Sequence, residues 1–178
     1  RMFGMLKDLL HTTNENDFNK LFSRIEKYEN ISDSMELEIA NYLNKVSEGR
    51  LSSESKLEIR GMLREVTEIE SIGDSCYNLA RTINRKRSGG NDFTEKQYEH
   101  IHQMMQLTDD ALAQMIAIVE DDYHVVDVNK TFNLENEINN YRAQLKNQNV
   151  VDVNNKEYDY QMGVHYMDII GECEKLGD

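Results

Sequence analysis

Proline is absent from the 178-residue sequence, and there are only nine glycines. Because these two residues interrupt helices most strongly, their scarcity predicts long helices. Basic residues are also few, since 33 acidic side chains against 20 basic ones leave a net charge of −13. That charge repels nucleic acids and anionic lipid surfaces, so neither is expected as a partner. Two β-branched stretches, 124–128 and 150–153, are too short to build a sheet.

Recognisable catalytic motifs are missing as well. Cys76 and Cys173 have no C-x-x-C spacing and lie in apolar patterns, which predicts reduced, buried thiols. The sequence has no Gly-rich nucleotide loop and no G-x-S-x-G segment, and its histidines lack zinc-binding spacing. These histidines are His11, His100, His102, His124 and His165. The chain is therefore not expected to be an enzyme.

No stretch is apolar over the roughly 20 residues that a membrane-spanning helix needs. Apolar residues instead recur every three or four positions, which predicts amphipathic helices. Ser52 or Ser53 is placed to cap the third helix, and Thr94 the fourth. The six expected helices are Met2–His11, Glu15–Val46, Ser53–Arg87, Thr94–Asp121, Val128–Asn147 and Lys156–Asp178, with the polar stretch Gln148–Asn155 as a linker.

An internal repeat organises these helices. The stretch 67–74, TEIESIGD, matches 171–178, GECEKLGD, at an offset of 104 residues. Glu29 and Asp33 correspond to Glu135 and Asn139 at an offset of 106. A helical unit is therefore present twice. We predict an all-α fold of two tandem three-helix repeats forming an antiparallel helical bundle, with the first repeat at 1–88 and the second at 89–178.

The repeat carries a pair of carboxylates. Glu70 and Asp74, like Glu174 and Asp178, are four residues apart, so each pair lies on one helix face about 5–6 Å apart and can converge on one cation. The first carboxylate of each pair falls within the apolar stripe of its helix. Carboxylates turned towards a packed face must be neutralised by protonation, by a basic partner or by a metal ion.

The same spacing also arises by chance in so acidic a chain. Glu54 with Glu58 and Glu95 with Glu99 repeat it without any matching copy. The usual outcome for such a pair is a solvated helix face. A structural interaction bundle, whose carboxylates are held by lysine and arginine without metal, therefore stays open as an alternative.

Part of the third expected helix resembles the sequence pattern of a known protein family. Its segment from Glu70 to Arg81, ESIGDSCYNLAR, resembles the E-R-I-G-D-x-x-x-N-I-A pattern of PhoU proteins. PhoU proteins consist of two three-helix repeats with E(D)-x-x-x-D motifs, which can bind iron or other divalent metal ions. The resemblance implies that the motifs of neighbouring helices converge on metal. The implied ligands are Glu29, Asp33, Glu70 and Asp74 in the first repeat, and Glu135, Asn139, Glu174 and Asp178 in the second.

The sequence departs from this pattern at a few positions. Ser71 and Lys175 replace the arginine that commonly follows the glutamate, and Asn139 replaces an acid, which weakens the second metal site. The residue pattern of Leu134–Arg142 resembles the cytoplasmic C-terminal domain of a bacterial sodium-dependent phosphate cotransporter more than a free-standing PhoU-type repressor. The two ends of the sequence, which look like those of a fragment, favour the same interpretation.

The cotransporter resemblance implies a regulatory role in phosphate transport at the cytoplasmic face of the inner membrane. The expected partner is a transporter membrane domain that precedes Arg1 in the same chain, while the present stretch is itself soluble. A phosphate-signalling protein and a second copy of the chain stay open as other partners. The basic run Arg81–Arg87 is interpreted mainly as a favourable charge set at a helix C-terminus.

Overall fold

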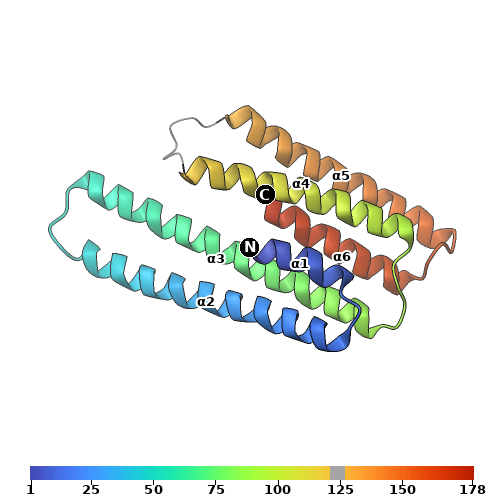
Figure 1. Cartoon of the computed structure of the whole chain (residues 1–178). Helices are drawn as coiled ribbons and strands as arrows, with labels where there is room; N and C mark the ends of the chain where they lie inside the picture. Colours follow the sequence, from blue (N-terminus) through green and yellow to red (C-terminus); the bar gives the residue numbers. More distant parts are fainter. Residues whose placement is uncertain (121–126) are drawn as a thin grey trace. The chain divides into compact units, whose positions relative to one another are not determined.

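A computed structural model describes residues 1–120 and 127–178. The described residues form α-helices without strands, which confirms the all-α prediction (Figure 1). The helices are α1 (Met2–His11), α2 (Glu15–Ser47), α3 (Ser53–Ser88), α4 (Glu95–Glu120), α5 (Val128–Asn154) and α6 (Tyr160–Gly177). Most of the 124–128 stretch lies outside the described residues, and 150–153 belongs to α5.

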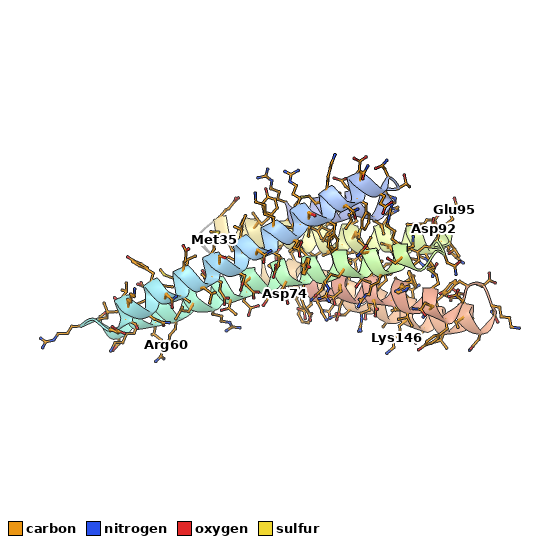
Figure 2. The ribbon with its side chains drawn as sticks, turned by 90° about the horizontal axis from the view of Figure 1, so that it is seen from below. Met35, Arg60, Asp74, Asp92, Glu95 and Lys146 are labelled. Carbon is orange, nitrogen blue, oxygen red and sulfur yellow. The ribbon has the colours of Figure 1, made fainter. Side chains whose placement is uncertain are left out.

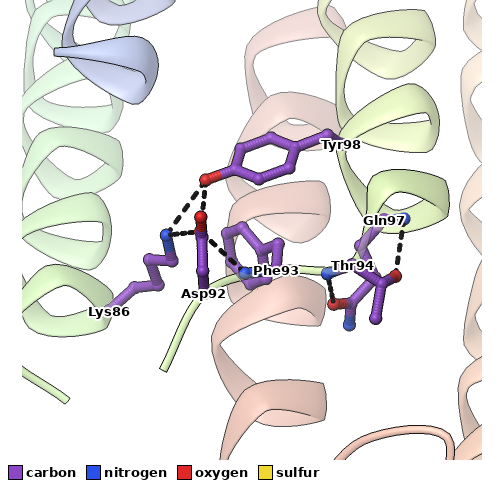
Figure 3. Close-up of polar contacts among 6 residues, drawn as sticks. All are labelled: Lys86, Asp92, Phe93, Thr94, Gln97 and Tyr98. Atoms are coloured by element: carbon purple, nitrogen blue, oxygen red, sulfur yellow. Dashed lines mark hydrogen bonds and ion pairs between the residues drawn. The ribbon is translucent and has the colours of Figure 1, made fainter. Parts of the chain in front are cut away.

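Side-chain caps begin several of these helices where the sequence placed them. The Ser52 hydroxyl accepts from the Ser55 amide at 3.1 Å. Thr94 and Gln97 form a reciprocal capping box, in which the Thr94 hydroxyl accepts from the Gln97 amide and the Gln97 side chain accepts from the Thr94 amide (Figure 3). Both expected caps are therefore confirmed.

The prediction for the end of the fifth helix was wrong. We expected a linker over Gln148–Asn155, but α5 continues to Asn154, and α6 begins at Tyr160 instead of Lys156. Contacts with α6 stabilise the extra turns: a Cβ at Gly163 would meet Val153 and Asn149 at 3.0 Å. Tyr158 also donates a hydrogen bond to the Asn149 side chain at 2.6 Å. Tertiary packing thus overrides the weak helix propensity of asparagine and valine.

The chain divides into two compact units, Arg1–Tyr77 and Asn78–Asp178, so that α3 contributes to both. These two units are defined by which residues lie close together in space. The repeat boundary after residue 88 is defined by sequence similarity, so the two boundaries need not coincide. In the first unit α1 packs against α2. Its buried side chains include Phe3, Leu6, Leu9, Phe18 and Ile25.

Within the first unit, many apolar residues of α2 and α3 are exposed. Met35, Tyr42 and Met62 belong to the apolar residues that recur along these helices, yet they are 55%, 68% and 49% exposed. Helix α1 has only ten residues and lies alongside the beginning of α2 (Figure 1). It is too short to cover the rest of a 33-residue helix.

In the second unit, α4, α5 and α6 pack against one another as an antiparallel three-helix bundle (Figure 1). The Thr108 hydroxyl, fully buried, bonds to the carbonyls of Met104 at 2.9 Å and Cys173 at 3.1 Å, which ties α4 to α6. Cys173 is buried in this core, and Cys76 is buried near the end of the first unit. Both side chains are buried, as predicted, and neither forms a disulfide with another described residue. Burial raises the pKa of the Cys76 thiol to about 12, which keeps it protonated.

Candidate cation site

Each repeat contains a place where one helix approaches another over a glycine. In the first unit, a Cβ at Gly73 of α3 would meet the Ser32 side chain of α2 at 3.3 Å. In the second unit, a Cβ at Gly177 of α6 would meet Ile138 of α5 at 2.4 Å. These two contacts are related by the same offsets of 104 and 106 residues that relate the sequence repeats. The duplicated sequence therefore produces the same close helix approach twice.

We call these places the first seam and the second seam. The first seam comprises Glu29 and Asp33 of α2 with Glu70 and Asp74 of α3, and Figure 2 shows Asp74 part-way along α3. The second seam comprises Glu135 and Asn139 of α5, Glu174 of α6 and Asp178 at the end of α6.

In the first seam, the carboxylates of α2 and α3 lie within electrostatic reach of each other. Burial raises the pKa of Glu70, and the charges of Glu36, Asp74, Asp33 and Glu29 raise it further. Burial likewise raises the pKa of Glu29, followed by the charges of Asp33, Asp74 and Glu26. The first seam is thus a site of mutual repulsion between like charges, which a cation would relieve.

The side chains of the first seam do not form a closed ligand cage. Among residues 1–120 and 127–178, no group of three or more His, Cys, Asp or Glu side chains is arranged so that it could hold a metal ion. Asp33 and Asp74 are exposed, whereas Glu29 and Glu70 are half-buried. Carboxylate oxygens are the ligands that hard divalent cations prefer, so the donor chemistry of the first seam suits such an ion.

The second seam differs because a basic side chain enters it. The Nε atom of Arg142 lies 3.6 Å from Oε2 of Glu174, an ion pair within the second unit. Asn139 has no charge, so the second seam contains three carboxylates, of which Glu174 is paired with the Arg142 guanidinium. Sequence reasoning missed Arg142 as a site residue. The 106-residue offset relates it to Glu36, which no motif marks.

The basic run at the end of α3 is engaged in contacts within the second unit. The Lys86 ammonium donates to the Asp92 carboxylate and, at 3.1 Å, to the Tyr98 hydroxyl (Figure 3). It also lies 4.7 Å from the centre of the Phe93 ring. Arg85 donates to the Thr82 hydroxyl at 2.9 Å. These contacts hold the α3–α4 connection, in agreement with the structural interpretation of the run.

A polar cavity of about 240 Å³ lies among α4, α5 and α6. Nδ1 of His100 and the Tyr166 hydroxyl are 2.9 Å apart on its wall. Burial lowers the pKa of His100, and burial raises the pKa of Tyr158 to about 12. No sequence motif predicts this cavity, because its side chains come from three helices and a loop at irregular spacing. His165 is buried in α6.

Comparison with known proteins identifies the first part of the chain. The family model of the PhoU domain matches residues 2–83. Residues 2–83 are therefore similar to a PhoU domain. All four residues of the first seam lie inside the matched range, whereas the second seam lies outside it. No curated protein and no solved structure gives a match.

The PhoU domain suggests a role in the regulation of phosphate homeostasis, and the family is regulatory and non-enzymatic. Over the part of the chain that the structure describes, no helix is long and apolar enough to cross a membrane.

Proposed function

We propose that this PhoU-domain protein regulates phosphate uptake or signalling by contacting a transporter, and that a divalent or iron-type cation at the first seam sets its conformation. The observation that supports the proposal is that Glu29 and Glu70, on two neighbouring helices, are each repelled by the charges of Asp33 and Asp74. A cation bound there would remove the mutual repulsion and hold α2 against α3. The cation itself would supply positive charge, and the chain supplies the oxygen ligands.

The contact with a transporter is supported by the exposed apolar residues of the first unit. Met35 and Tyr42 of α2 are separated by two helical turns, and Met62 belongs to α3. Large apolar side chains that are left exposed on neighbouring helices favour a site of protein interaction. The alternative partner, a phosphate-signalling protein, would use the same surface.

Manganese binding tests the cation. We expect the purified chain, after removal of chelator, to bind Mn²⁺ and to lose this binding in the variant Glu70→Gln with Asp74→Asn. The matched control is Glu54→Gln with Glu58→Gln, a pair at the same spacing on the same helix. Equal Mn²⁺ affinity in the seam variant and in the wild type would eliminate the cation and leave the structural interaction bundle.

Phosphate uptake tests the transporter contact. Cells that carry Met35→Glu with Met62→Glu should lose regulation of uptake, because two charges are placed on the apolar surface. A control variant, Asn41→Glu with Arg60→Glu, adds acidic residues at exposed positions on the same two helices. Regulated uptake that is unchanged in the first variant would exclude this surface as the contact.

A further inference from the structure

The two seams differ in charge at Asp33, which is matched to Asn139, and at a further pair of positions beside them. The offset of 106 residues relates Glu36 to Arg142, and the offset of 104 relates Thr67 to Gly171. The first repeat thus has an acid and a threonine where the second has a base and a glycine.

The contacts at these positions differ accordingly. In the first unit, the Thr67 hydroxyl donates to Oε1 of Glu36 at 3.1 Å. In the second unit, a Cβ at Gly171 would be in ordinary van der Waals contact with Nε of Arg142 at 4.0 Å, so Gly171 lies beside the guanidinium and only a side chain larger than alanine would compete with it for space. Arg142 pairs with Glu174, whereas Glu36 adds one more negative charge beside Glu70.

From this juxtaposition we infer that Arg142 is the resident cation of the second seam, so that this seam keeps its acidic side chains together without metal and the chain has a single cation site. The statement that the chain has a single cation site rests on the proposed function, because it assumes that the first seam binds a cation. The statement that Arg142 neutralises the second seam does not, because it rests on the ion pair between Arg142 and Glu174.

The surroundings of Glu174 favour arginine over an exchangeable ion. The Glu174 side chain is only 18% exposed and the Nε atom of Arg142 is buried, while the Arg142 side chain as a whole is 43% exposed. A guanidinium stays charged at any pH that proteins tolerate, so its neutralising effect is permanent. A metal ion at this place would have to displace Arg142 and would find Asn139 in place of a carboxylate.

Exchange of the matched residues between the seams tests the number of sites in the full chain. Wild type should bind one Mn²⁺, and Glu36→Arg with Thr67→Gly should abolish that binding although all four carboxylates of the first seam remain. Conversely, Asn139→Asp with Arg142→Glu and Gly171→Thr should add a second Mn²⁺. If wild type with Glu70→Gln and Asp74→Asn keeps an Mn²⁺ that Glu174→Gln removes, the inference is overturned.

Thermal unfolding in chelator separates failure of this inference from failure of the proposed cation site. Arg142→Gln and Glu174→Gln should each lower the unfolding temperature by about 1–3 °C, and the double variant should lose no more than the larger single effect. If wild type binds no Mn²⁺ but this coupling is present, the proposed cation site fails and Arg142 retains its role. Additive or absent effects of the two variants would refute that role.

Discussion

Gly177 shows how closely the helices of one repeat approach at a single residue. The nearest atom to a Cβ at this position would be Cδ1 of Ile138 at 2.4 Å, and Ile138 is only 1% exposed. The isoleucine has little space to move away, so we predict that Gly177→Ala lowers the free energy of unfolding by about 1–2 kcal/mol. Urea denaturation measures this change.

Gly61 provides the control for this prediction. It lies inside α3, and no atom is found within 4 Å of its added Cβ. Gly61→Ala should therefore raise stability by up to about 1 kcal/mol through helix propensity alone. The prediction for Gly177 is wrong if both substitutions change stability in the same direction.

Asp92 gives a prediction for acid pH. Burial acts to raise the pKa of its carboxyl group, but hydrogen bonds from Lys86 and Tyr98 outweigh burial and lower the pKa below its usual value of 3.8. A carboxyl group with a lowered folded-state pKa stabilises the fold above about pH 4, and this contribution is lost as the pH falls through the folded-state pKa.

The variant Asp92→Asn tests that dependence. Because the Asp92 side chain is 72% exposed, we expect only a small loss at pH 7, about 1–2 °C in the unfolding temperature. The difference from wild type should shrink between pH 5 and pH 3, where the wild-type carboxylate becomes protonated. A difference that stays constant over this range would contradict the role of the ion pair with Lys86.

At the scale of the helix, the start of α4 depends on one capping residue. Thr94 accepts from the Gln97 amide at 3.1 Å, and its own amide donates to the Gln97 side chain at 3.0 Å. We predict that Thr94→Ala costs about 1 kcal/mol in the free energy of unfolding, while Thr94→Ser keeps most of the stability. Chemical denaturation followed by circular dichroism measures both, and equal losses would show that the hydroxyl group is not responsible.

Helix existence and most starts could be predicted from the sequence because they depend on local signals. Apolar spacing indicates the helices, and Ser52 and Thr94 act within three residues of themselves. The end of α5 could not be predicted in this way, because Val153 and Asn149 are held by Gly163 of another helix. The exposure of Met35 could not be predicted either, because periodicity identifies an apolar face but not whether another helix covers it.

The same distinction applies to the candidate site. The acidic pair of α3 and its copy in α6 could be found by comparing the sequence with itself. The counter-charge of the second seam could not be found from the acidic motif, because Arg142 lies on α5 and meets Glu174 of α6 only in the folded unit. Motifs identify carboxylates, whereas the structure shows what neutralises them.

At the scale of the whole molecule, both seams have a glycine that lies against the facing helix, but the seams differ in charge. This contrast predicts opposite effects for one substitution at equivalent positions. In chelator at pH 7, Glu70→Gln should raise the unfolding temperature, because it removes a carboxylate repelled by Glu36 and Asp74. Glu174→Gln should lower it by about 1–3 °C, because Arg142 loses the charge that it faces.

Both variants remove one negative charge from a chain with a net charge of −13, so relief of general repulsion is the same in each. The sign of the difference therefore reports the local surroundings of each glutamate. Adding Mn²⁺ should reverse the advantage of Glu70→Gln, since wild type alone then gains a bound cation. If both variants shift the unfolding temperature in the same direction in chelator, the two seams are electrostatically alike and the contrast drawn here is wrong.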